Sequence, residues 1–213
     1  MTSEHRSLSR VSVAQWRIVG FTAFYMVVAL VAALVRKNPE FIFYLVVMAV
    51  LIGVTTLVHL RSPLSNGALW GLSLWGLAHL AGGLMPIPEH WPILGETHVL
   101  YNWWLIPEWI KYDQVVHAYG FGVMTWVCWQ GLQQAMSAYQ VRPRPTLGLM
   151  VLCVAGGMGF GAANEVVEFI ATQTLPDTNV GGYENTGWDL VANLVGCILA
   201  AALIAGCSGR RVD

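Results

Sequence analysis

The chain has 213 residues, of which 56% are hydrophobic, and its 11 Lys and Arg against 12 Asp and Glu give a formal net charge of −1. With a mean hydropathy of +0.57, this composition differs strongly from that of a soluble domain and predicts an integral membrane protein. The nearly neutral charge, without a basic cluster, argues against a nucleic-acid partner.

Apolar stretches occur at six places, and each is long enough for a helix that crosses about 30 Å of hydrocarbon. They cover about 14–35, 41–60, 68–84, 113–136, 146–173 and 188–204. Because most connections between them are short, we expect residues 1–213 to form a single integral membrane domain. The predicted fold class is all-α: a polytopic membrane helical bundle of about six transmembrane helices.

The orientation of the bundle is predicted from its basic residues. The first apolar stretch follows a polar, Arg-bearing segment and is long enough to span, so we expect an uncleaved signal anchor. Eight basic residues fall on one predicted side and three on the other, and the richer side should be cytoplasmic. Both termini are therefore expected in the cytoplasm. The eight are Arg6, Arg10, Arg17, Arg61, Arg142, Arg144, Arg210 and Arg211, and the three are Arg36, Lys37 and Lys111.

Carboxylates lie inside or at the mouth of three predicted helices that contain no Lys or Arg. An uncompensated carboxylate in hydrocarbon costs at least about 2.5 to 3.5 kcal/mol, so each must be protonated, hydrated or bound to a cation. The predicted topology places four carboxylates and two imidazoles at one depth near the outer face. These six residues are His79, Asp113, His117, Glu165, Glu168 and Asp189.

Helical spacing supports a shared site, because residues three or four apart project from one face of a helix. This relation holds for Asp113 with His117, for Glu165 with Glu168, and for Asp189 with Asn193. Two imidazoles and several carboxylates are ligands suited to a divalent metal such as zinc, iron or manganese. The same groups are also the components of a proton relay.

The outer loop, residues 85–111, is long for a connection in a bundle and is rich in Pro and Trp. One interpretation is an aromatic belt that rests on the lipid headgroups. The alternative is a lid that admits an amphiphilic substrate from the outer leaflet. In that case Tyr101 and Tyr112 are expected to donate hydrogen bonds at the site.

Several motifs together resemble a known family. They are HLAGG from His79, YDQVVH at Tyr112–His117, the NEVVEF stretch that begins at Asn164, and WDLVANLVG from Trp188 to Gly196. Their order resembles that of the YjdF-like inner-membrane proteins, and more distantly that of VanZ-like proteins. The resemblance implies an inner (cytoplasmic) membrane location but no reaction. The chain has Asn164 where the YjdF-like pattern usually has a Tyr before its first Glu, and we expect Asn164 and Asn193 to support the site.

Three functions remain open at this point. In the first hypothesis, the polar residues bind one or two divalent ions that activate water for hydrolysis or group transfer on a lipid-linked substrate. Alternatively, they form the proton or cation site of a small transporter or lipid carrier. In the third hypothesis, the chain is a non-catalytic membrane scaffold. The sequence does not decide whether the protein is an enzyme, and it does not predict the oligomeric state.

Overall fold

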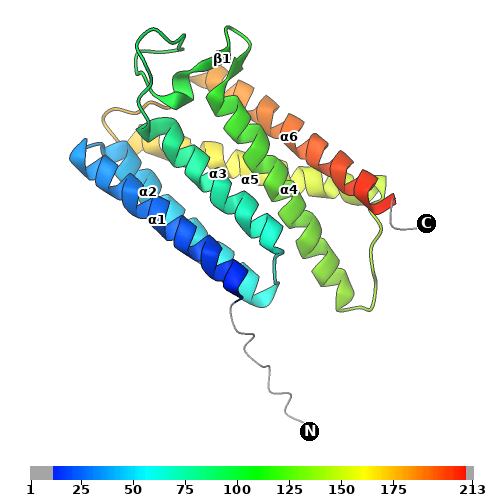
Figure 1. The fold of residues 1–213 in the computed structure, drawn as a ribbon. Coiled ribbons are helices and arrows are strands. Elements are labelled where there is room, and N and C mark those ends of the chain that lie inside the picture. The colour runs from blue at the N-terminus through cyan, green and yellow to red at the C-terminus, as the bar shows by residue number, and fades with distance from the viewer. Residues whose placement is uncertain (1–11, 210–213) are drawn as a thin grey trace.

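The computed structural model describes residues 12–209 as a bundle of six long helices (Figure 1). Four of the basic residues that are predicted to lie on the cytoplasmic side fall outside the described residues: Arg6, Arg10, Arg210 and Arg211. The helices are α1 (Val13–Val35), α2 (Pro39–Arg61), α3 (Asn66–Leu84), α4 (Tyr112–Ser137), α5 (Leu147–Thr174) and α6 (Tyr183–Gly209). The six predicted helices are thus confirmed as helices.

Residues 85–111 contain a short 3₁₀ helix, η1 (Leu100–Asn102), and two short antiparallel strands, β1 (Trp104–Ile106) and β2 (Ile110–Lys111). The fold is therefore mostly helical, with one small hairpin that the sequence did not predict. Figure 1 shows this segment as a cap over one end of the bundle. We call this end the capped end.

Most helices begin at a side chain that the sequence could identify as a cap. Ser12 Oγ accepts a hydrogen bond from the Gln15 amide, and Gln15 Oε1 accepts one from the Ser12 amide, which completes a capping box. Asn38 caps α2 just before Pro39, and Thr146 caps α5 in the same way. Such caps satisfy amide groups that have no partner inside the helix.

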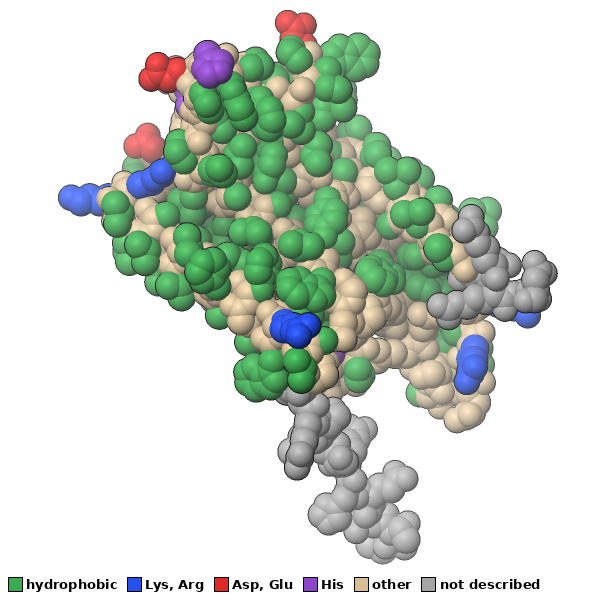
Figure 2. Space-filling model, viewed as in Figure 1, with side chains coloured by type: hydrophobic (Ala, Val, Ile, Leu, Met, Phe, Trp, Pro, Cys, Tyr) green, Lys and Arg blue, Asp and Glu red, His purple; other side chains and the backbone are tan. Residues whose placement is uncertain are grey.

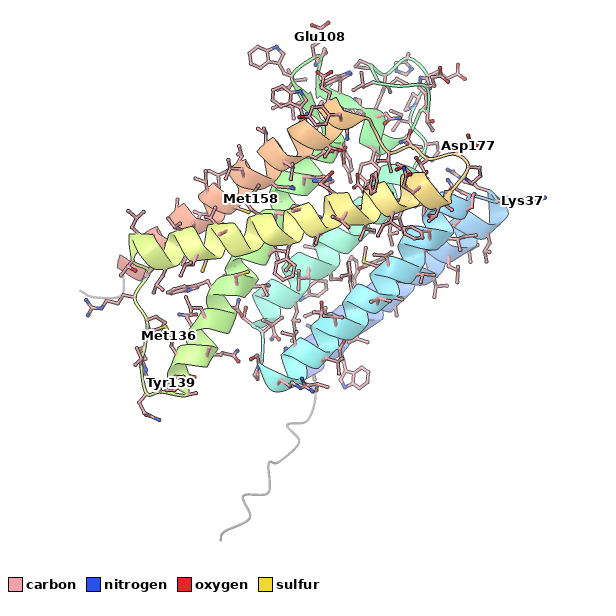
Figure 3. The ribbon with its side chains drawn as sticks, turned by 180° about the vertical axis from the view of Figure 1, so that it is seen from behind. Lys37, Glu108, Met136, Tyr139, Met158 and Asp177 are labelled. Atoms are coloured by element: carbon pink, nitrogen blue, oxygen red, sulfur yellow. The ribbon has the colours of Figure 1, made fainter. Side chains whose placement is uncertain are left out.

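The helices alternate in direction, so the connections fall at two ends. Figure 3 shows Lys37, Glu108 and Asp177 at the capped end and Met136 and Tyr139 at the opposite end. The three connections that are predicted to lie on the outer, non-cytoplasmic side of the membrane thus share one end of the molecule. Which end faces the cytoplasm remains a prediction.

Within residues 12–209, four helices, α1, α2, α5 and α6, are long and apolar enough to cross a membrane. Their exposed faces carry large hydrophobic side chains, among them Phe24, Val46, Leu152 and Ile198. In Figure 2, hydrophobic side chains cover the middle of the visible face, while charged side chains lie mainly toward its edges. A spanning role for α3 and α4 remains a prediction. Each of these two helices carries two Trp residues, and α4 contacts α3, α5 and α6.

The contact between α4 and α6 is close because glycine is present where the helices cross. A Cβ on Gly196 would lie 1.8 Å from the Ala118 carbonyl oxygen, and a Cβ on Gly122 would lie 3.1 Å from the Gly196 carbonyl oxygen. Small residues allow helix backbones to approach in this way. The same crossing brings the polar faces of α4 and α6 together one to two turns away.

Candidate metal centre

His117 lies at the centre of the polar cluster, at the meeting point of α4, α5 and α6. Its side chain is 4% exposed. Its Nε2 lies 3.6 Å from Asp113 Oδ1 on the same helix, and its Nδ1 lies 3.8 Å from Glu165 Oε1 on α5. Nδ1 also lies 3.0 Å from Asn193 Oδ1 on α6. In the neutral tautomer that carries its proton on Nδ1, the ring donates to this amide oxygen and the Nε2 lone pair is free.

A chain of polar contacts orients the two aspartates. Lys111 Nζ lies 3.7 Å from Asp113 Oδ2 and donates a hydrogen bond to Asn185 Oδ1. Asn185 Nδ2 in turn donates to Asp189 Oδ2 at 2.5 Å. One oxygen of each aspartate therefore has a fixed partner on the protein, and both partners come from the capped end of the bundle.

Several buried polar atoms have no hydrogen-bond partner among residues 12–209. They are both carboxylate oxygens of Glu165, Oδ1 of Asp189 and Nδ2 of Asn193. Asp189 and Asn193 are fully buried, and the Glu165 side chain is 10% exposed. Leaving a buried polar group unpaired costs about 1 to 3 kcal/mol, and more for a charged group. A cluster of such atoms is typical of a site that holds a ligand or an ion.

The ligand atoms form two groups that share His117. Asp113, His117 and Asp189 each offer one atom, and these atoms lie within 4.8 Å of one another. The same holds for His117, Glu165 and Glu168. Five of the six predicted site residues are thus brought together. Asn164, which was predicted to support the site, donates a hydrogen bond to Glu168 Oε1 at 2.9 Å.

His79 belongs to neither group. Its Nδ1 lies 2.5 Å from the Tyr101 hydroxyl, and its ring packs edge-on against Tyr44. Burial, followed by the negative charges of Asp113 and Glu168, holds the pKa of Tyr101 well above its usual value. Tyr101 is therefore a neutral hydrogen-bond donor to His79. Tyr112 donates to the Ala78 carbonyl oxygen, so both tyrosines do donate, but to α3 and not to a carboxylate.

A cavity of about 1010 Å³ lies at the capped end, between the helix ends and residues 85–111. Asp113 and Glu168 line it, so it reaches both groups of ligand atoms. His79, Tyr101 and Glu40 also line it, together with Trp104, Trp109 and Trp188. The outer loop thus forms part of the wall of a cavity next to the polar cluster.

The sequence analysis missed three residues of this region: Glu40, Lys111 and Asn185. Lys111 was counted as a loop charge, yet it is 4% exposed and faces Asp113. Asn185 lies four residues before Asp189, a spacing that could have marked it. The Glu40 carboxylate accepts a hydrogen bond from the backbone N–H of Asn179, whose nitrogen lies 3.0 and 3.1 Å from its two oxygens. The two residues are 139 positions apart, so no local pattern indicates this contact.

The comparison with protein families gives a clear result. Residues 18–210 match the family described as predicted membrane proteins, DUF2238. The chain belongs to this family. The YjdF-like resemblance is thereby confirmed, since YjdF is a DUF2238 protein, whereas the VanZ-like resemblance gains no support. DUF2238 membership agrees with the long apolar helices of the bundle.

A relative of this DUF2238 chain is an uncharacterised protein of Thermotoga maritima, which is 29% identical over 94 residues. The aligned part covers 44% of this chain and 47% of the relative, so the match spans about half of each protein. No solved structure matches the chain.

Proposed function

We propose that this DUF2238 protein binds a divalent transition metal at His117 and uses it for hydrolysis or group transfer on a lipid-linked substrate. The observation that carries the proposal is the buried, unpartnered Asp189 Oδ1 beside Asp113 and His117. The proposed ligands are His117 Nε2, Asp113 Oδ1 and Asp189 Oδ1. One imidazole and two carboxylates suit zinc, iron or manganese.

The surrounding residues support this choice of ligand atoms. Metal-binding histidines usually donate their other ring N–H to an acceptor, which fixes the tautomer, and Asn193 Oδ1 takes this role for His117. Lys111 and Asn185 hold the second oxygen of Asp113 and of Asp189, respectively, so the first oxygen of each is left for the ion. A divalent ion supplies Lewis acidity, which generates a nucleophile from water at neutral pH.

The cavity supports a substrate that arrives from the membrane surface. Asp113 is shared by the cavity and the proposed ligand set, so a group in the cavity can reach the ion. Trp109 and Trp188 line the cavity and are 80% and 54% exposed. Aromatic residues of this kind are enriched at the depth of lipid headgroups. We therefore place the acyl part of the substrate in the lipid and its polar head in the cavity.

We further propose that all six helices cross the inner membrane, with both termini in the cytoplasm and the capped end outside. Two of the three basic residues that oppose this orientation have partners inside the protein. Arg36 donates to the Leu84 carbonyl oxygen at 2.7 Å, and Lys111 contacts Asp113. These contacts support the proposed orientation, because charges held within the protein are not free to act as loop charges.

Elemental analysis of the detergent-purified protein tests the metal proposal. The wild type is expected to hold one or two equivalents of a divalent metal, and His117→Ala and Asp189→Asn are expected to lose it while remaining folded. His90→Ala, at an exposed loop histidine, is the matched control and keeps the metal. A metal-free wild type contradicts the proposal. If the variants of such a protein also unfold, the cluster is a structural network, as in the scaffold hypothesis.

A further inference from the structure

The Glu165 carboxylate is the least satisfied group in the described part of the chain. Both of its oxygens are buried and lack a hydrogen-bond partner among residues 12–209, and its side chain is only 10% exposed. The ligand set proposed above does not use it. His117 Nδ1 lies 3.8 Å from Glu165 Oε1, but that nitrogen lies closer to Asn193 Oδ1, at 3.0 Å.

Glu168 lies one turn further along α5, and its ligand atom is within 4.8 Å of that of Glu165. Glu168 lines the 1010 Å³ cavity, whereas Glu165 lies behind it, next to His117. Asn164 donates to Glu168 Oε1 and so orients that carboxylate. The pair thus offers several oxygen atoms. The Glu168 carboxylate faces the cavity, and the Glu165 carboxylate has no hydrogen-bond partner among residues 12–209.

The charges of the region also leave room for a second cation. Seven carboxylates lie in or beside the cavity and the His117 cluster, of which Glu108 and Glu184 are exposed, and the only Lys or Arg among the described residues of this region is Lys111. Counted as ionised, the five carboxylates that are not exposed have, together with Lys111, a formal charge of −4, which matches two divalent cations and not one. The five carboxylates are Glu40, Asp113, Glu165, Glu168 and Asp189.

We infer that Glu165 and Glu168 form a second cation site, separate from the His117 ligand set, that takes a hard divalent ion such as Mg²⁺ or Mn²⁺. Carboxylate oxygens are the ligands that these ions prefer, and Mg²⁺ in particular is often held by one or two carboxylates and completed by water or substrate oxygens. The inference rests on the proposed function, since it assigns the first ion to Asp113, His117 and Asp189.

Two measurements on the same sample test this site. Purified protein is loaded with one equivalent of zinc, the zinc is quantified, and Mn²⁺ is then titrated while free Mn²⁺ is followed by electron paramagnetic resonance. The wild type is expected to retain zinc and to bind one Mn²⁺. Glu165→Gln and Glu168→Gln are each expected to retain zinc and to bind Mn²⁺ at least about tenfold more weakly, because even outer-shell changes have effects of that size.

Glu184→Gln is the matched control, since Glu184 lines the same cavity but is exposed, and it keeps wild-type Mn²⁺ binding. Zinc binding without any Mn²⁺ binding overturns the second site and leaves the proposed function intact. Loss of zinc together with Mn²⁺ in both glutamine variants also overturns it, because the glutamates then belong to a single centre. A wild type that binds no zinc contradicts the proposed function instead.

Discussion

Lys111 Nζ lies 3.7 Å from Asp113 Oδ2, and both side chains are largely buried, at 5% and 14% exposure. Lys111 is the last residue of the outer loop, residues 85–111, and Asp113 is in the first turn of α4. The ion pair therefore connects the cap to the candidate metal centre. Asp113, one of the four carboxylates whose own helices contain no Lys or Arg, therefore has a cationic partner outside its helix.

Replacing Lys111 tests this connection. In metal-free protein, Lys111→Met leaves Asp113 without its cation, and we expect the free energy of unfolding to fall by about 2 to 3 kcal/mol, less than for a fully buried pair. In metal-loaded protein the ion compensates the same carboxylate, so the loss should be smaller. Thermal unfolding in detergent, with and without a chelator, measures the difference.

Lys37→Met provides the control, because Lys37 is an exposed residue of the α1–α2 connection and is expected to change neither form. An equal loss in metal-free and metal-loaded Lys111→Met would show that Asp113 is not a metal ligand.

The helix crossing that aligns the site gives a second prediction. Gly196→Ala places a methyl group 1.8 Å from the Ala118 carbonyl oxygen, so α4 and α6 must separate. We expect a loss of about 3 kcal/mol or more, at the upper end of overpacking effects, together with weaker metal binding. Gly206→Ala on the same helix has nothing within 4 Å of the new methyl and should be neutral or slightly stabilising. Equal thermal stability of the two variants would contradict this packing.

Tyr101 gives a prediction about pH. An unfolded tyrosine releases its proton near pH ~10, whereas the raised pKa keeps Tyr101 protonated in the folded protein. Above that pH the unfolded state binds fewer protons, so stability falls as the pH rises, and below it Tyr101 contributes no pH dependence. Tyr101→Phe should therefore lose stability less steeply than the wild type above pH ~10, by up to about 1.4 kcal/mol per pH unit.

Denaturant unfolding from about pH 8 to about pH 11 measures this slope around the ordinary tyrosine pKa. Tyr139→Phe, at a side chain that is 81% exposed, is the matched control and keeps the wild-type slope. Parallel curves for the wild type and Tyr101→Phe would place Tyr101 in water.

The helices were predictable because long apolar runs and cap residues are local signals. The start of α6 was not predictable in this way. The expected start near residue 188 is five residues too late, because Tyr183–Gly187 are mostly polar. Asn185 belongs to the first turn of α6, where its side chain reaches Asp189 one turn later. A polar turn that satisfies a buried carboxylate has no hydrophobic signal.

Site residues were predictable as pairs on one helix but not as contacts between helices. The spacing of Asp113 and His117 placed them on one face, yet it did not show that Asn193, 76 positions away, would meet the His117 ring. For the same reason His79 was grouped with the ligands, since depth in the membrane does not specify direction around the helix axis. That direction is set by close approaches such as the one at Gly196.

The proposed orientation is tested by labelling single cysteines in a cysteine-free background. A hydrophilic thiol reagent added outside intact cells should label a cysteine at Glu96 or Asp177, both exposed at the capped end, but not one at Tyr139 at the opposite end. Disruption of the cells should make the cysteine of Tyr139→Cys reactive, which controls for its accessibility. Labelling of Tyr139→Cys alone in intact cells would place the cluster at the cytoplasmic face.

The central claim is a metal centre with one imidazole and two carboxylates, and X-ray absorption at the edge of the bound metal tests it most directly. For zinc, we predict a single imidazole at about 2.0–2.1 Å, with the other ligands oxygen at about 2.0–2.2 Å. His79→Ala should leave this spectrum unchanged, and His117→Ala should abolish metal binding. Protein without metal, a sulfur ligand, or a second imidazole that disappears in His79→Ala would contradict the account.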